Sequence, residues 1–232
     1  MQQEDMQEKE IVKLELLEIE RDAVVDGVEQ VRLRTNDGEI PCRFHSTVNG
    51  DAAVLWVSGS QGGLDGPAGG LYERLAGQLV PDGIASLQLD YRKPGQLIDC
   101  VLDVLLGIGF LRNQGARRIA LVGHSFGGAV VINAAVASPG VVAVVALSSQ
   151  MLGADDIGQL SPRPVLLIHG ESDEVRSDIG SRQLYELAGE PKQLVLYPGC
   201  GHGFDECRDE LDRDLLAWLR RVMFASEPNQ GA

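Results

Sequence analysis

The chain has 232 residues, of which 44% are hydrophobic and 5% aromatic, so its length and composition fit one globular domain with a mostly aliphatic core. The formal net charge is −14 and the sequence pI is about 4.6. An acidic surface repels phosphate groups, which argues against nucleic acid or anionic lipid as a partner. We expect no secretory signal and no membrane span, and therefore a cytoplasmic protein.

The first fifty residues predict antiparallel strands. Residues 1–10 are polar, and we expect them to be disordered. Residues 11–20 favour a bulged strand over a short helix, because their apolar alternation slips at Leu16-Leu17. A hairpin should follow, in which residues 31–35 and 40–45 are joined at Asn36-Asp37-Gly38, three residues that tolerate the positive φ of a tight turn.

After residue 50, apolar strands alternate with helices. The expected strands are residues 53–57, 84–89, 119–122, 141–147, 165–168 and 193–197. The expected helices are residues 71–80, 96–113, 126–137, 177–187 and 209–224. Strands that are apolar on both faces and are separated by helices indicate a mostly parallel twisted sheet with helices on both faces. We predict an α/β fold in which residues 11–224 form a single domain without a large lid, followed by a loose tail at residues 225–232.

The strand at residues 119–122 is followed by Gly123-His124-Ser125-Phe126-Gly127-Gly128 and then by a helix. This is the G-x-S-x-G pattern in the strand–turn–helix context that gives it a catalytic meaning. The sharp turn strains the backbone of the serine, and side chains two residues to either side would collide. We therefore expect Ser125 to be a nucleophile exposed at the carboxyl edge of the sheet, beside the N-terminus of the helix.

At these residues the chain resembles the α/β-hydrolase superfamily, over roughly residues 30–224. The segments 58–63, 89–92 and 123–128 are similar to the dienelactone-hydrolase-like and acyl-CoA-thioesterase-like branches. The resemblance implies an α/β-hydrolase fold and a serine nucleophile that needs neither cofactor nor metal. Dienelactone hydrolases proper carry a cysteine nucleophile where this chain has Ser125, so the resemblance does not extend to the dienelactone substrate.

A nucleophilic serine needs a general base, and the chain has four histidines. His45 lies in the N-terminal hairpin, far from the expected edge. His124 should point away from its neighbour Ser125 and pack, and His169 should have a structural role at the end of its strand. His202 follows the last strand in a glycine-rich loop, as the Ser…Asp…His chain order of this fold requires, so we predict that it is the base.

The third member should be a carboxylate that holds the imidazole in place. Asp173 follows the strand at residues 165–168 and lies between Ser125 and His202 in the sequence, with Glu171, Glu174 and Asp178 as competitors. The pattern H-G-x-x-D-x-x-V resembles the acid loop of the superfamily and selects Asp173. The preceding strand ends in residues 148–150 without a carboxylate, which favours the same choice.

Two backbone N–H groups should bind the oxyanion of the tetrahedral intermediate. One belongs to Phe126, the residue after the nucleophile. By resemblance the other belongs to Ser60, or to Gln61 after a small shift of register. The expected walls of the substrate pocket are Gln61, Leu64, Tyr91, Phe126, Met151, Leu152 and Phe204.

The four cysteines, at positions 42, 100, 200 and 207, include no C-x-x-C pair, and we expect reduced thiols. Cys200 and Cys207 flank His202, but their spacing matches no common zinc motif, so we expect no metal.

The sequence predicts a serine hydrolase that cleaves a carboxylic ester or thioester of a small to medium-sized soluble substrate through an acyl-enzyme on Ser125. Two alternatives stay open. An acyltransferase or peptidase could use the same three residues, and a ligand-binding protein could keep the fold without turnover. The oligomeric state cannot be predicted from these patterns.

Overall fold

The computed structural model describes residues 13–224, so the predictions for residues 1–10 and 225–232 lie outside the described part. The strands are β1 Leu16–Arg21, β2 Val28–Thr35, β3 Gly38–His45, β4 Ala52–Val57, β5 Ile84–Leu89, β6 Arg118–His124, β7 Val141–Leu147, β8 Val165–Gly170 and β9 Lys192–Tyr197. The α-helices are α1 Pro67–Leu79, α2 Leu97–Asn113, α3 Phe126–Ala137, α4 Ile179–Leu187 and α5 Arg208–Phe224. Short 3-10 turns, η1 Val80–Asp82 and η2 Asp155–Leu160, complete the described elements.

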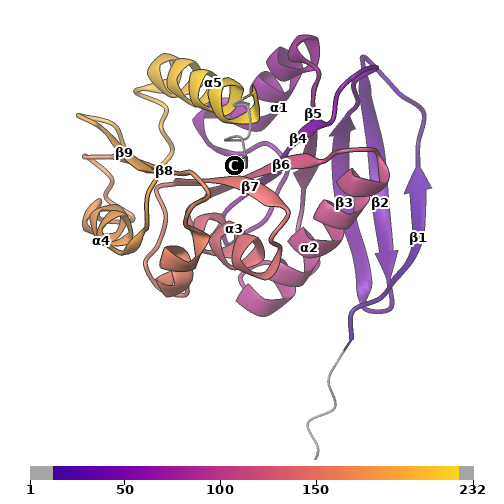
Figure 1. The fold of residues 1–232 in the computed structure, drawn as a ribbon, viewed down its shortest axis with the longest axis horizontal. Coiled ribbons are helices and arrows are strands. Elements are labelled where there is room, and N and C mark those ends of the chain that lie inside the picture. Colours follow the sequence, from indigo (N-terminus) through magenta and orange to yellow (C-terminus); the bar gives the residue numbers. More distant parts are fainter. Residues whose placement is uncertain (1–12, 225–232) are drawn as a thin grey trace, which may run out of the picture.

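The strands form one nine-stranded sheet in the order β1-β2-β3-β5-β4-β6-β7-β8-β9. The pairs β1–β2, β2–β3 and β3–β5 are antiparallel. The remaining pairs, from β5 through β4, β6, β7 and β8 to β9, are parallel. Figure 1 shows helices α1 and α5 on one face of the sheet and α2, α3 and α4 on the other. The predicted fold class is confirmed, because a sheet with apolar strands needs helices on both sides to exclude water.

The N-terminal antiparallel strands follow the expected patterns. The register of β1 against β2 shifts between Leu16 and Glu18, where the apolar alternation slips in the sequence. Thr35 pairs with Gly38 at the tip of the β2–β3 hairpin, and Gly38 has a φ of +111°, a value that favours glycine.

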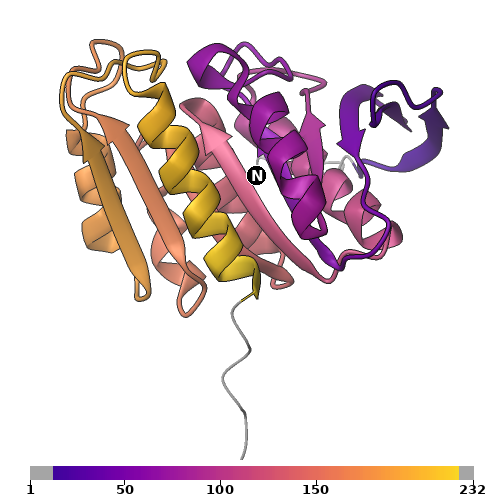
Figure 2. The ribbon, with the colours of Figure 1, turned by 90° about the horizontal axis from the view of Figure 1, so that it is seen from above.

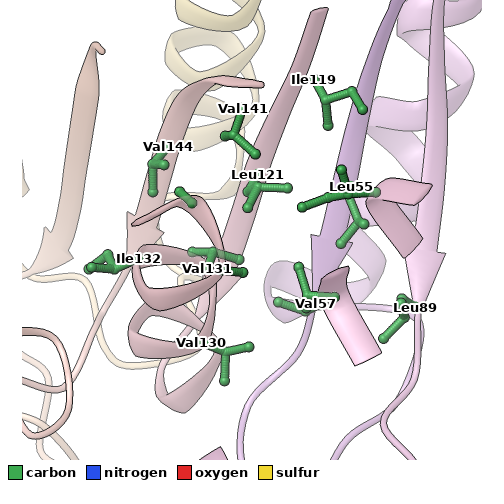
Figure 3. Close-up of a cluster of buried hydrophobic side chains, with 14 of the residues drawn as sticks. Leu55, Val57, Leu89, Ile119, Leu121, Val130, Val131, Ile132, Val141 and Val144 are labelled. Carbon is green, nitrogen blue, oxygen red and sulfur yellow. The ribbon is translucent and has the colours of Figure 1, made fainter. Parts of the chain in front are cut away.

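The larger core lies between the sheet and the α2–α3–α4 layer. Every residue of β4 is buried, and the turns of α3 pack against the strands β6 and β7 beside it. Figure 3 shows aliphatic side chains from these elements interleaved, among them Leu55, Leu121, Val131 and Val144. Burial of such side chains contributes about 1.5–3 kcal/mol each, which fixes the central strands as a rigid base for the loops at their ends.

The second core lies under α1 and α5, which run across the other face of the sheet (Figure 2). Trp56 and Tyr72 stack here with ring centroids 5.3 Å apart, and the Tyr72 hydroxyl donates to the Val57 carbonyl over 2.7 Å. Helix α1 begins at Pro67, four residues before the expected start. Its first turn is irregular, because Ala68, Gly69 and Gly70 all have positive φ.

None of the helices among residues 13–224 combines the length and the apolar composition needed to cross a membrane.

Candidate active site

The turn between β6 and α3 has the strained geometry that its sequence predicts. Ser125 has φ 56° and ψ −117°, in the positive-φ region that side chains rarely adopt, and its N–H donates to the Leu147 carbonyl over 2.8 Å. A Cβ at Gly123 would overlap the Gly127 carbonyl, and one at Gly127 would overlap the Ser58 carbonyl. The glycines are therefore required by backbone contacts, and they place Ser125 between a central strand and a helix N-terminus.

The loop after β4 runs beside this turn. A Cβ at Gly59 would lie 3.6 Å from the Ser125 Cβ. Two residues after β5 hold the loop in place. The Tyr91 hydroxyl donates to the Ser58 carbonyl over 3.1 Å, and Asp90 Oδ1 accepts from the Gly63 N–H over 2.7 Å. This gives a physical reason for the Leu89-Asp90-Tyr91-Arg92 segment of the sequence: it braces the loop that faces Ser125.

Asp173 and His202 lie together at the carboxyl ends of β8 and β9. His202 Nδ1 is 2.7 Å from Asp173 Oδ2, and the Asp173 carboxylate is fully buried while the imidazole is 19% exposed. Because an ionised carboxylate only accepts hydrogen bonds, Nδ1 carries the proton and Nε2 is left as an acceptor. The neutral imidazole is thus in the tautomer that a general base requires.

The Asp173 carboxylate is held in its charged form. Burial alone would raise its pKa, but hydrogen bonds from the backbone N–H of Arg176, from His202 and from the backbone N–H of Val175 outweigh burial, and the pKa is lowered. Both N–H groups lie 2.8 Å from Oδ1. The acid loop therefore folds around one carboxylate oxygen and leaves the other for the imidazole.

His124 links the serine turn to the histidine loop. Its Nε2 lies 3.0 Å from the His202 carbonyl oxygen and donates to it, and the two imidazole rings are 4.8 Å apart. Burial lowers the pKa of His124 to about 4, so its ring stays neutral at physiological pH. The expectation that His124 only packs is incomplete, because it also fixes the backbone of His202.

The histidine loop contains a disulfide between Cys200 and Cys207, which corrects the prediction of four reduced thiols. Both residues are buried, and the Cys200 carbonyl accepts from the Ser172 N–H over 2.9 Å, which joins the loop to the acid loop. Cys42 and Cys100 are free and buried. The pairing was missed because seven residues separate the two cysteines in a loop whose closure depends on the fold. Within residues 13–224, no cluster of three or more His, Cys, Asp or Glu side chains could hold a metal ion.

Ser125, Asp173 and His202 thus gather at one edge of the sheet. Within the described part of the chain, no hydrogen bond joins Ser125 Oγ to His202 Nε2. The N–H groups of Ser60 and Phe126 donate no hydrogen bond to another described residue. Phe126 follows the nucleophile in the chain, and Ser60 follows Gly59, which lies beside Ser125. Together these groups are the parts that an acyl-transfer centre requires.

A cavity of about 410 Å³ opens beside the serine turn, and its walls include Gly59, Leu64, Ala68, His124 and Gly203. Leu64 lines it as expected.

The other predicted wall residues do not line this cavity. Gln61 is on the surface, Met151 is half-buried and Leu152 is 81% exposed. Phe204 is wholly buried against α5, and Tyr91 is 4% exposed with its hydroxyl bonded to the main chain. Predicting Phe204 as a wall was wrong, because an aromatic ring in a glycine-rich loop turned inward to fill the core rather than outward.

The remaining histidines are His45 and His169. His45 is buried on β3 opposite Ser86, away from the carboxyl edge, with Nε2 3.5 Å from Glu73. His169 is also buried, but its Nε2 lies 3.1 Å from Asp173 Oδ2. The sequence held a signal for this contact, since His169 and Asp173 are four residues apart around a strand end. The burial of His169 fits the structural role that the sequence predicts at the end of this strand.

These features define an α/β hydrolase, and comparison with solved structures supports the same fold. Dienelactone hydrolase from Anabaena variabilis superposes with a TM-score of 0.73 at 18% identity and covers 85% of this chain and 99% of its own. A serine hydrolase homologue from Coxiella burnetii superposes with a TM-score of 0.70 at 17% identity, over 85% of this chain and all of its own. At such identities the likeness shows the fold alone.

Sequence comparison identifies the family. Residues 86–225, more than half of the chain, match the dienelactone hydrolase family, and the chain belongs to that family. It is therefore a hydrolase of the α/β fold.

Two uncharacterized relatives match the chain as well. YfhR of Escherichia coli O157:H7 is 34% identical over 100 residues, a match that covers 43% of this chain and only 34% of that protein. Rv2307c of Mycobacterium tuberculosis is 28% identical over an alignment of 235 residues, which covers 88% of this chain and 79% of that protein.

Proposed function

We propose that the protein is a serine hydrolase that cleaves a carboxylic ester or thioester through an acyl-enzyme on Ser125. The observation that carries the proposal is the 2.7 Å hydrogen bond from His202 Nδ1 to the buried Asp173 carboxylate. This bond fixes the tautomer of His202, and the His202 carbonyl accepts a hydrogen bond from His124, the residue before Ser125. A buried carboxylate paired with a histidine contributes little net stability to a fold. The Asp173–His202 pair is therefore more readily explained as the activator of a nucleophile.

The reaction follows from these roles. His202 Nε2 accepts the proton of Ser125 as Oγ attacks the acyl carbon, and Asp173 stabilises the imidazolium without taking its proton. The backbone N–H groups of Phe126 and Ser60, or of Gln61, bind the oxyanion. The alcohol or thiol leaves with the proton from His202. Water then attacks the acyl-enzyme with the same histidine as its base, and the free acid departs.

The surroundings of Ser125 favour a substrate with an apolar acyl group. Leu152 is 81% exposed, and Ile98, Val175 and Ile179 are 76%, 67% and 58% exposed in segments that follow the carboxyl ends of β5 and β8. Exposed apolar side chains that gather at one edge of a sheet more often form a binding surface than a surface that stays in contact with water. We propose that Gln61, Leu64, Met151 and Leu152 contact a small to medium-sized substrate, with no metal or cofactor.

We also propose a cytoplasmic location. The Cys200–Cys207 disulfide argues against this location, because disulfides form and persist mainly in oxidising compartments. Fractionation of tagged cells, with alkylation of free thiols at lysis, therefore tests the location and the redox state of this pair together.

The test is a panel of p-nitrophenyl esters and acyl thioesters assayed with the wild-type protein and with Ser125→Ala. We expect turnover of part of the panel by the wild type and its loss by at least about 10⁴-fold in the variant, because the acyl-enzyme cannot form. Ser46→Ala, in the exposed loop after β3, is the matched control and should keep full activity.

Equal activity of Ser125→Ala would refute the proposal. If the acid is replaced by a new ester when an alcohol is added, the same residues serve acyl transfer. Tight ligand binding without turnover by the wild type would assign the protein to the non-catalytic alternative.

A further inference from the structure

His169 ends strand β8 and has no exposed surface, yet both of its ring nitrogens have polar partners. Nδ1 lies 2.7 Å from Ser181 Oγ on helix α4. Nε2 lies 3.0 Å from the Arg176 carbonyl oxygen and 3.1 Å from Asp173 Oδ2. The ring therefore connects helix α4 to the carboxylate that holds His202.

The partners determine where the proton of the His169 ring lies. A backbone carbonyl and an ionised carboxylate can only accept, so Nε2, which faces both, carries the proton. In the neutral ring Nδ1 is then an acceptor, and it receives the hydroxyl proton of Ser181. Ser181 is fully buried, and by donating to Nδ1 its hydroxyl holds the ring in the orientation that keeps Nε2 on the acid loop.

Counting the donors shows what His169 adds to the acid loop. Asp173 Oδ1 accepts two backbone N–H groups at 2.8 Å, one of them from Arg176, and Oδ2 accepts His202 Nδ1 at 2.7 Å. His169 Nε2 lies 3.1 Å from Oδ2, but its one N–H donates to the Arg176 carbonyl over 3.0 Å. His169 therefore holds the residue whose N–H fixes Oδ1, and so limits rotation that would carry Oδ2 away from His202.

We propose that His169, oriented by Ser181, is a positioning residue that locks Asp173 in the rotamer that serves His202. The inference rests on the proposed function, since it assigns a role in the same reaction. His169 touches no reacting atom and acts only through Asp173. Its effect should therefore appear in the rate of the chemical step and not in the affinity for substrate.

The experiment measures labelling of Ser125 by a fluorophosphonate probe, with the maximal labelling rate separated from the concentration for half-maximal rate. His169→Leu removes the donor to the Arg176 carbonyl, and His169→Gln returns an amide N–H close to the Nε2 position. We expect the maximal rate to fall about tenfold in His169→Leu, because the Arg176 carbonyl loses its one hydrogen bond to the imidazole, with unchanged half-maximal concentration. His169→Gln should recover most of the rate.

Two further variants separate positioning from folding. His45→Leu removes another buried imidazole, on β3 and away from Asp173, and should label at the wild-type rate. Ser181→Ala leaves the His169 ring in place without the hydroxyl that orients it, and we expect a fall of a few-fold in the maximal rate. If His169→Leu does not fold, as thermal unfolding would show, Ser181→Ala and His169→Gln decide the matter.

Wild-type labelling rates in His169→Leu, or in Ser181→Ala when the leucine variant does not fold, would overturn the positioning role. An equal loss in His169→Gln and His169→Leu would overturn it too, since a purely structural defect would not depend on the N–H. Failure of the proposed function looks different, because the wild-type protein itself would then take no label at Ser125.

Discussion

The serine turn and the two loops that carry Asp173 and His202 meet at one edge of the sheet, but different forces hold them. The turn follows the central strand β6, and its shape is imposed by main-chain contacts of Gly123 with Gly127 and of Gly127 with the Ser58 carbonyl after β4. The loops follow β8 and β9 at the side of the sheet. Their alignment depends on bonds between distant residues, including the Asp173–His202 pair and the disulfide.

The difference teaches that the nucleophile's turn is specified by steric contacts of the main chain, whereas its helpers are specified by hydrogen bonds between loops. A short glycine pattern can hold Ser125 in its strained conformation because the clashes, including the one with the Ser58 carbonyl, involve main-chain atoms. The acid and base need a preorganised set of hydrogen bonds that no short motif contains. His124 belongs to both regions, since it precedes Ser125 and donates to the His202 carbonyl.

The largest effect should come from breaking the turn. In Gly127→Ala the new Cβ would overlap the Ser58 carbonyl and come within 2.9 Å of the Val57 carbonyl, and neither can move without disturbing β4. We expect the free energy of unfolding to fall by about 4 kcal/mol, the upper range for a single substitution, as measured by urea denaturation.

Gly77→Ala is the matched control for this substitution. Gly77 lies within helix α1, is exposed, and has nothing within 4 Å of an added Cβ. Alanine should raise the free energy of unfolding there by about 0.5–1 kcal/mol. Equal effects of the two substitutions would contradict the steric account of the turn.

A smaller effect is expected at the junction of the two regions, where burial lowers the pKa of His124 from 6.5 to about 4. Between these values the unfolded chain binds a proton at this residue and the folded chain does not. Stability is therefore present above pH 6.5 and is lost as the pH falls towards 4, by about 3 kcal/mol from this group.

The measurement is the free energy of unfolding against pH for the wild type and for His124→Gln. The glutamine variant should be less stable at neutral pH, because its bond to His202 is altered, but its curve should be flatter below pH 6.5. Parallel curves for the two proteins would show that the imidazole of His124 does not stay neutral in the fold.

The smallest of the three effects should come from opening the disulfide in the histidine loop. Cys200 and Cys207 are seven residues apart, so closing this short loop stabilises the fold by about 2.5 kcal/mol in the chain-entropy account. Reductant should lower the free energy of unfolding of the wild type by this amount, which appears as a lower urea midpoint. In the double variant Cys200→Ser/Cys207→Ser it should have no effect, and an unchanged wild-type midpoint would contradict the pairing.

The sequence predicted the features that depend on periodicity and on local sterics. Alternating apolar strands and helices gave the sheet and its helical layers, and the slip at Leu16-Leu17 gave the bulge in β1. The glycines around Ser125 gave the turn, because their role is steric and involves main-chain atoms that the strand–turn–helix context implies. Chain order and glycine context selected His202, and the H-G-x-x-D-x-x-V resemblance selected Asp173 from the neighbouring carboxylates; the structure brings the two within hydrogen-bonding distance.

Features that depend on side chains meeting across the fold were not predicted. The Cys200–Cys207 bond requires a loop closure that spacing does not reveal, and the inward turn of Phe204 depends on space left under α5. The approach of His169 Nε2 to within 3.1 Å of Asp173 Oδ2 depends on how the loop after β8 folds back, with the Arg176 carbonyl 3.0 Å from the same nitrogen. Each of these is a consequence of packing, which a linear pattern does not encode.

The central claim is that Asp173 and His202 make Ser125 reactive. It is tested most directly by the rate at which a fluorophosphonate labels the wild type and Asp173→Asn at neutral pH, with the modified peptide mapped. Asparagine keeps the shape but reverses the hydrogen bond to the imidazole, so we predict that the label lies on Ser125 and that labelling slows by about 10⁴-fold in the variant. Equal rates in the two proteins, or a label on another residue, would contradict the claim.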